Sequence, residues 1–268
     1  MISSKQYDTQ VTPTLRRDNP IPLENYTSPA SLFLEEEVYR IGGLPGLRSL
    51  PPGPERDFLT LSWGPIVYRT SYAPETKRLL PVFLRYLNNS VQQALRRTFT
   101  GSDEEIEILT TTYSSKIFSS RDMYTNMDEE AIRQAFHDFK VSLGIPETEL
   151  PSRLRICLML DEEALSHMKC VLDLSSMAEE DADVGGCCVK VVEENFPDSR
   201  MGDHPLSKPN IEGVSGSVGE YRGSYHGWTM VALDALVEVF DGLRQMKWLV
   251  DYHREGKVYL GEGKWRSL

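Results

Sequence analysis

The sequence has no long hydrophobic run, and this absence limits the classes of protein to which it can belong. Residues 1–6, Met-Ile-Ser-Ser-Lys-Gln, lack the apolar stretch of a signal peptide, and no later run approaches the length needed to cross a bilayer. We therefore expect a soluble intracellular protein without a membrane partner. The cytoplasm is the expected compartment, and nothing in the sequence excludes the nucleus.

Cysteine is scarce, which argues against a disulfide scaffold or a zinc ribbon. The chain has 4 cysteines, none in a Cys-x-x-Cys pair. Cys157 lies in an apolar run and Cys187 and Cys188 are adjacent, so we expect reduced, buried thiols, with a vicinal redox switch as the alternative. The 5 histidines are scattered, with no pair at the helical spacing of a metal site. We expect no metal.

Glycine motifs for catalysis or cofactor binding are also missing. The nearest approach, residues 213–219, has the wrong spacing for a nucleophile elbow. No strand precedes it and no Lys-Ser/Thr follows it, so it does not match a phosphate-binding loop either. We expect no cofactor, and the sequence leaves open whether the protein is an enzyme.

Positive charge is in deficit. The chain has 29 basic and 40 acidic residues, a net charge of -11 and a pI near 5.0, a balance that repels nucleic acid. Four arginines (Arg78, Arg85, Arg96 and Arg97) share one predicted helix, but a solvated basic face needs no partner. Because no basic patch is interleaved with aromatic residues, we expect no nucleic-acid partner.

Residues 61–99 are the most informative stretch, since they predict a strand, a turn and a long amphipathic helix. Ile66, Val67 and Tyr68 are residue types that favour strands. Apolar residues recur at helical spacing from Leu80 to Leu95. Pro81 conflicts with a continuous helix, because proline removes a backbone hydrogen bond, and the helix could instead begin near Leu80.

Similar patterns continue along the chain and predict an α+β domain. The expected strands are 65–71, 110–118, 154–160, 187–193 and 228–233, with a last strand through 258–260. The expected helices are 76–98, 128–143, 161–169 and 234–246. This order predicts a mostly antiparallel sheet with helices packed on one face, a variant of the ferredoxin-like arrangement.

Two segments differ in composition from this domain, which spans residues 58–268. Frequent prolines in residues 1–57 predict a largely disordered N-terminal arm. Within the arm, residues 31–41 predict a short helix that packs on the domain or acts as a docking motif. Glycine and serine are frequent in residues 200–225, which predicts a flexible surface loop.

Five residues are candidates for ligand binding because they lie where strands meet loops. Tyr68, Arg69 and Tyr72 lie at the end of the first predicted strand, and His226 and Trp228 at the start of a later one. No catalytic residue is assigned. Glu193 and Glu194 could divide acid and base roles, but the sequence favours a strand end exposed to water.

Several of these segments resemble a group of uncharacterised intracellular proteins from filamentous fungi. The resemblance rests on Trp63-Gly64, residues 68–72, residues 153–158 with Asp161, and residues 227–231, and it spans about residues 58–250. It implies a fungal intracellular protein. It brings no activity and no binding residues.

We therefore expect a non-catalytic binding or protein-interaction domain. The alternative is a small-molecule-binding protein or an enzyme, with a pocket between sheet and helices and the five candidate residues near its mouth. Its partner, a protein or a small molecule, is not identified by the sequence.

Overall fold

A computed structural model describes residues 28–39, 50–144, 150–175, 187–196, 225–245 and 247–268. Two parts of the predicted arm, residues 1–27 and 40–49, lie outside the described residues, as do residues 200–224 of the predicted loop. In the described part of the chain, no helix is long and apolar enough to cross a membrane.

The described strands form one mixed sheet in the order β2-β1-β3-β4-β5-β6-β7. Their bounds are β1 (Ile66–Arg69), β2 (Lys116–Phe118), β3 (Ile156–Leu160), β4 (Cys188–Glu193), β5 (Trp228–Ala232), β6 (Lys257–Gly261) and β7 (Lys264–Ser267). β2 and β7 are the two edge strands. β7 follows β6 directly and was not predicted from the sequence.

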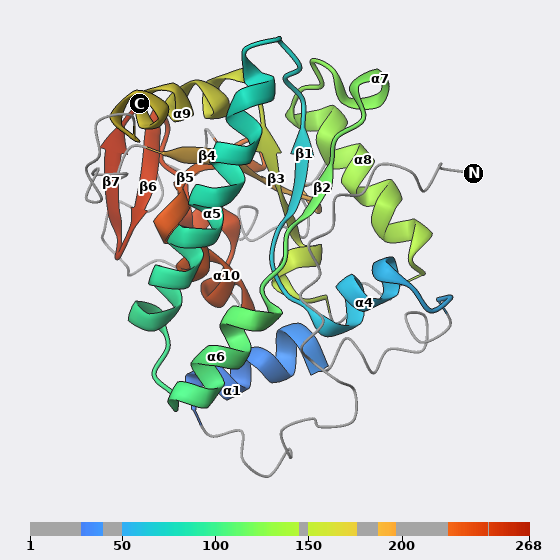
Figure 1. The fold of residues 1–268 in the computed structure, drawn as a ribbon, viewed down its shortest axis with the longest axis vertical. Coiled ribbons are helices and arrows are strands. Elements are labelled where there is room, and N and C mark those ends of the chain that lie inside the picture. The colour runs from blue at the N-terminus through green and yellow to red at the C-terminus, as the bar shows by residue number, and fades with distance from the viewer. Residues whose placement is uncertain (1–27, 40–49, 145–149, 176–186, 197–224, 246) are drawn as a thin grey trace, which may run out of the picture.

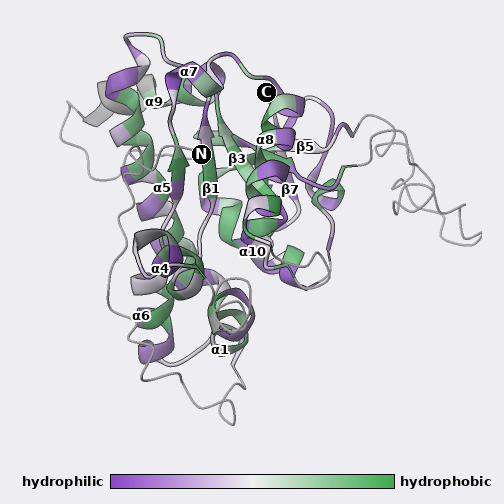
Figure 2. Ribbon diagram, turned by 90° about the vertical axis from the view of Figure 1, so that its right-hand side faces the viewer, coloured by the Kyte–Doolittle hydropathy of each residue, from purple (hydrophilic) through white to green (hydrophobic). Residues whose placement is uncertain are grey.

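Helices lie on both faces of the sheet (Figures 1 and 2). The longer ones are α4 (Pro54–Leu61), α5 (Thr76–Thr98), α6 (Asp103–Thr112), α8 (Glu129–Ser142), α9 (Glu162–Ser175) and α10 (Leu236–Arg244). The short ones are α1 (Pro29–Leu34), α7 (Arg121–Tyr124), a π-helical turn (Glu35–Tyr39) and 3₁₀ turns at Ser152–Leu154, Leu233–Ala235 and Leu249–Tyr252.

The two faces bury separate hydrophobic clusters. On one face, α5 packs against α9, α10 and α6 and covers residues such as Val67 and Leu158. On the other face, α8 covers Tyr68 and Met159 through Ile132 and Phe136. Strand residues alternate between the faces, so neighbours such as Val67 and Tyr68 enter different clusters. This explains why every residue of β1 and β3 is buried, where a sheet covered on one face only would alternate between buried and exposed residues.

The prediction of a mixed helix and strand domain is confirmed, but the antiparallel, one-sided arrangement is not. β1 pairs in parallel with β2 and with β3, and β5 pairs in parallel with β6, while the other three pairings are antiparallel. Between β1 and β2 the chain passes through α5 and α6, and this crossover allows it to return in the same direction. α8 then follows β2 on the opposite face.

The helix predicted at 76–98 is confirmed over its full length, with Pro81 inside it. The later start near Leu80 is therefore wrong. Pro81 is the sixth residue of the helix and is itself exposed, so its ring faces solvent rather than the buried stripe. The helix tolerates the backbone hydrogen bond lost at Pro81 because packing of its eight buried side chains stabilises it.

The strand predicted at 110–118 is wrong in its first half, where α6 continues to Thr112. The run Thr110-Thr111-Thr112 is β-branched, but the hydroxyls of Thr110 and Thr112 donate to the carbonyls of Ile106 and Ile108, four residues earlier. A capping box between Ser102 and Glu105 starts the helix. Only Lys116–Phe118 form the strand.

The helix expected near residues 31–41 is present and packs into the core. Phe33 is fully buried and lies edge-on to Trp63, with ring centroids 4.9 Å apart. Glu37 accepts a hydrogen bond of 2.7 Å from the Ser152 amide. This segment is therefore part of the folded unit, which favours simple packing over a docking motif.

Candidate functional site

Tyr68, the first sequence-predicted site residue, is a core residue. It is 1% exposed, and its ring stacks on Phe118 with centroids 4.8 Å apart. Its hydroxyl donates to the carbonyl of Ala135 in α8 at 3.3 Å. Tyr68 therefore joins α8 to the sheet and does not face a ligand site.

Arg69 and Tyr72 lie at the carboxyl end of β1. The Arg69 Nε donates to the Ser71 carbonyl at 2.8 Å and one of its terminal nitrogens to the Thr76 hydroxyl at 3.2 Å. The guanidinium also lies 4.7 Å from the centre of the half-buried Tyr72 ring. Burial lowers the pKa of Arg69 and raises that of Tyr72. These contacts tie the end of β1 to the start of α5.

His226 and Trp228 lie at the opposite end of the sheet from Arg69. Trp228 pairs with Val192, which in turn pairs with Cys157 at the start of β3, whereas Arg69 pairs with Leu160 at its end. His226 is exposed, and the Trp228 ring lies 5.2 Å from the Lys190 ammonium. The structure therefore does not bring the five predicted residues together.

Glu193 and Glu194 are buried, so the expectation of a water-exposed strand end is wrong. Glu193 accepts a 2.7 Å hydrogen bond from the Tyr225 hydroxyl, and burial raises its pKa. Glu194 lies 2.7 Å from His137 and pairs with Lys140, both on α8. The sequence missed this because the partners, Tyr225 and two residues of α8, lie more than thirty residues away along the chain.

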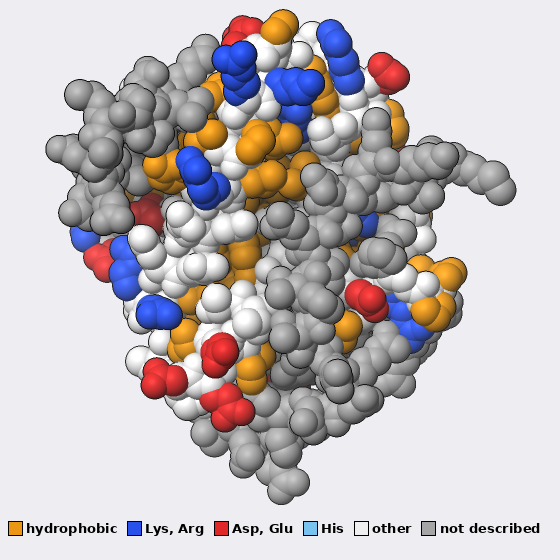
Figure 3. Space-filling view, viewed as in Figure 1, with side chains coloured by type: hydrophobic (Ala, Val, Ile, Leu, Met, Phe, Trp, Pro, Cys, Tyr) orange, Lys and Arg blue, Asp and Glu red, His pale blue; other side chains and the backbone are white. Residues whose placement is uncertain are grey.

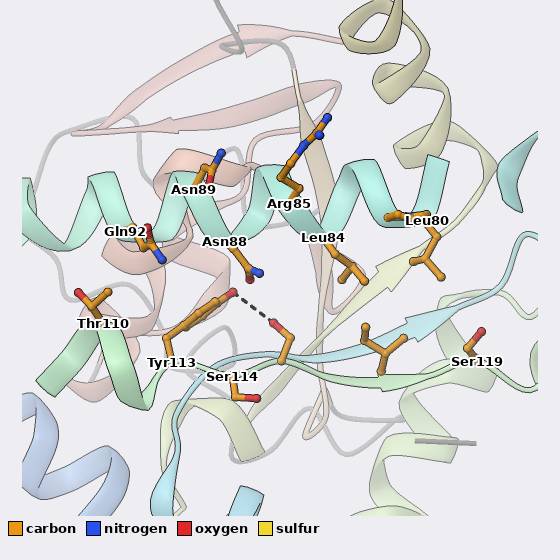
Figure 4. Close-up of a pocket in the computed structure, with 13 residues that line it drawn as sticks. Leu80, Leu84, Arg85, Asn88, Asn89, Gln92, Thr110, Tyr113, Ser114 and Ser119 are labelled. Atoms are coloured by element: carbon orange, nitrogen blue, oxygen red, sulfur yellow. Dashed lines mark hydrogen bonds between the residues drawn. The ribbon is translucent and has the colours of Figure 1, made fainter. Parts of the chain in front are cut away.

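A groove lies between α5 and the edge strand β2 (Figures 3 and 4). It has a volume of about 760 Å³, and none of the five predicted site residues lines it. On the helix side its lining includes Leu80, Leu84, Asn88 and Gln92. On the strand side its lining includes Tyr113, Ser115, Ile117 and Ser119.

The two walls of the groove have matching spacings. The helix residues are four apart, which corresponds to a rise of about 6.0 Å. The strand residues are two apart, a rise of about 6.6 Å, so the rows stay nearly in step along the groove. Figure 4 shows Leu84 and Asn88 pointing from α5 toward the strand side. Residues of α5 and residues of the strand side therefore face each other at matching intervals along the groove.

The chemistry of these positions changes along the groove. Leu80, Leu84 and Ile117 make one half apolar. The carboxamides of Asn88 and Gln92 make the other half polar, together with the Tyr113 hydroxyl, which lies 3.2 Å from the Ser115 hydroxyl. Burial raises the pKa of Tyr113, so this hydroxyl stays protonated at neutral pH.

The outer edge of β2 has backbone groups that no described strand pairs with. The amides of Ser114 and Lys116 donate toward the preceding strand, to the carbonyls of Trp63 and Pro65 at 2.8 and 3.0 Å. Since these groups alternate in direction along a strand, the amides and carbonyls of Ser115 and Ile117 point outward. Among the described strands, β2 pairs only with β1.

The opposite edge strand, β7, is different. It carries the exposed residues Lys264 and Arg266, and charged side chains on an edge strand discourage pairing with another chain. The outward positions of β2 carry no charge, because the one lysine of that strand, Lys116, is 2% exposed with its ammonium 4.7 Å from the Phe139 ring. β2 is therefore the unprotected edge.

Sequence reasoning did not find the groove, because it placed the apolar residues from Leu80 to Leu95 together on one face of an amphipathic helix and singled out none of the lining residues as a ligand-binding candidate. The available signal was the common four-residue spacing of Leu80, Leu84, Asn88 and Gln92. In the described part of the chain, no group of three or more His, Cys, Asp or Glu residues could hold a metal ion. Comparison with family models, with curated proteins and with solved structures finds no match.

Proposed function

We propose that this protein is a non-catalytic protein-interaction module that binds an extended segment of a partner protein along β2, within the groove against α5. The observation that carries the proposal is the uncharged edge of β2, whose outward amides and carbonyls lie beside a row of α5 side chains in step with it. Peptides that add a strand to a sheet gain affinity from main-chain hydrogen bonds and specificity from pockets for alternate side chains.

The groove offers both kinds of contact. An added strand would pair with the outward groups of Ser115 and Ile117. Alternate side chains of that strand would face α5, where Leu80 and Leu84 can cover one apolar side chain, a burial worth about 1.5–3 kcal/mol. The carboxamides of Asn88 and Gln92 each offer a donor and an acceptor, the pair of groups that a peptide unit presents.

A small molecule is the second candidate ligand, because the groove volume of about 760 Å³ falls in the range of small-molecule sites, roughly 300–1,000 Å³. This ligand would use the side chains of the groove and not the strand edge. The two candidates therefore differ in their dependence on the β2 backbone.

A matched pair of variants tests the strand-pairing proposal. Ser115→Pro removes one outward amide without removing a bond to β1, since proline is tolerated on an edge strand where its missing N–H faced outward. Ser115→Ala removes the hydroxyl and keeps the amide. Displayed random 12-residue peptides are selected on the wild-type chain, and their affinities for both variants are measured.

We expect Ser115→Ala to bind the selected peptides within about twofold of wild type and Ser115→Pro to bind them roughly tenfold more weakly, the effect of about one lost hydrogen bond. Equal binding by the proline variant, with an unchanged thermal midpoint, would overturn strand pairing. Leu84→Trp, which fills the groove, should abolish binding of peptides and of any small molecule. If Leu84→Trp abolished binding and Ser115→Pro did not weaken it, a small-molecule ligand would be favoured over strand pairing.

A further inference from the structure

Positive charge is concentrated on the helix that forms one wall of the groove. α5 contains five basic residues and no acidic residue, although the whole chain has 40 acidic residues. The five are Lys77, Arg78, Arg85, Arg96 and Arg97. All are exposed, and none makes an ion pair within the described part of the chain. α5 is thus a basic ridge on a protein of net charge -11.

Three of these residues lie on the groove side of α5 near Leu80, and a fourth, Arg96, follows the lining residue Gln92 by four positions at the other end. Arg85 lines the groove itself. Lys77 and Arg78 precede the lining residue Pro81 by four and three positions, so they lie on the same helix face. They mark the end of the groove where Leu80 and Ser119 lie. Figure 3 shows Lys and Arg side chains gathered around this upper end of the hollowed face.

Acidic side chains lie beyond the other end of the groove, past the lining residue Thr110, and none of them lines the groove itself. The first turn of α6 carries Asp103, Glu104 and Glu105, and Asp and Glu side chains gather at the lower end of the face in Figure 3. A bound segment with negative charge throughout would be attracted at one end and repelled at the other. A segment with acids at one end only would match the charges along the whole groove.

We propose that the partner segment is acidic at the end that lies beside Lys77, Arg78 and Arg85, and that it is followed by an apolar side chain over Leu84 and Ile117. This inference rests on the proposed strand pairing at β2 and adds the chemistry of the partner. Acidic segments would also be steered to this face, since it is the basic part of an otherwise acidic protein. Nucleic acid, which is negative throughout, is disfavoured by the α6 end of the groove.

Charge reversal at two arginines of the same helix tests the inference. Arg85→Glu and Arg97→Glu change the net charge equally and both sites are exposed. Arg97 lies outside the arc of α5 that lines the groove, because at about 100° per residue it falls on another side of the helix. The probes are 12-residue peptides selected on the wild-type chain and a 12-nucleotide single-stranded DNA.

We expect the selected peptides to carry two or more Asp or Glu residues on one side of an apolar residue. Arg85→Glu should weaken their binding roughly five- to thirtyfold, as attraction at an exposed site becomes repulsion, and Arg97→Glu should leave it within about twofold. Binding should weaken as salt rises from 50 to 300 mM, because exposed charges are screened.

Three other outcomes would overturn the inference in distinguishable ways. Selected peptides without acidic enrichment, bound equally by Arg85→Glu, would refute the acidic partner and leave strand pairing in place if Ser115→Pro still weakens them. Peptides insensitive to both Arg85→Glu and Ser115→Pro would refute both proposals. If the wild-type chain bound the DNA probe more tightly than every selected peptide, the partner would be a nucleic acid and not an acidic protein segment.

Discussion

Replacement of Arg153 by methionine should destabilise the protein strongly, because this arginine is fully buried and connects three parts of the fold. Its guanidinium donates to the carbonyls of Phe58, Leu59 and Ser62 at the end of α4. Glu37, itself 1% exposed, stabilises the charge of Arg153. Burial nevertheless lowers the pKa of Arg153 to about 10.

The magnitude follows from what the substitution leaves behind. Each buried polar group left without its partner costs about 1–3 kcal/mol, and the substitution leaves the carbonyls of Phe58, Leu59 and Ser62 without their donor, so the loss should be about 3–5 kcal/mol. Domains are stable by only about 5–15 kcal/mol, so the loss is a large fraction of the total. At about 2–4 °C per kcal/mol for a chain of this size, the thermal midpoint should fall by roughly 6–20 °C.

Urea unfolding followed by tryptophan fluorescence measures this change. Arg78→Met on the exposed face of α5 is the matched control, and should change stability by less than about 0.5 kcal/mol. The double variant Glu37→Gln/Arg153→Met should be less destabilised than the sum of the single variants, since the glutamine leaves no buried charge. An Arg153→Met protein within about 1 kcal/mol of wild type would refute the stabilising role assigned to Arg153.

Three further predictions concern the half-buried His253, the strand start at Gly64 and the thiols. Burial, and then the charge of His226, lowers the pKa of His253 below 6.5, so the folded state loses stability as pH falls through that lowered pKa. We expect the urea midpoint of the wild type to fall as pH is lowered from 7.5 to 5.5, and the midpoint of His253→Phe to fall less. If both proteins showed the same dependence of the midpoint on pH, His253 would not be the group responsible. Gly64→Ala should destabilise by more than about 1 kcal/mol in the same assay, since φ is +133° and a Cβ would lie 2.4 Å from the Ser114 carbonyl oxygen, and a neutral effect would contradict this geometry. Burial raises the pKa of Cys188 to about 11, so thiol titration at pH 8 should leave Cys188 and the buried thiols of Cys157 and Cys187 unreacted until urea is added.

Local pattern was enough to predict most of the elements. The strand at 66–69 and the helix at 76–98 follow from β-branched residues and from apolar spacing that only one helix face can satisfy. The helix at 129–142 begins where the Asp128 side chain accepts a bond from the Ala131 amide. These signals lie within a few residues of one another, and a sequence displays them directly.

The arrangement of elements and the groove depend on contacts between distant residues. A parallel or antiparallel pairing is decided by where a crossover helix packs, and the sequence near β1 is the same in both cases. Arg69 was correctly predicted at the carboxyl end of a strand, but its donors are taken by Ser71 and Thr76. Whether a polar residue at a strand end binds a ligand or a neighbouring loop is decided by the tertiary fold.

The contrast between the two edges of the sheet also bears on self-association. If both edges were open, β7 of one copy could pair with β2 of the next, and head-to-tail repetition of that contact would grow a fibre without end. The exposed Lys264 and Arg266 on β7 oppose this. These charges make β7 a poor pairing partner for β2 of another copy, which opposes head-to-tail polymerisation through the two sheet edges.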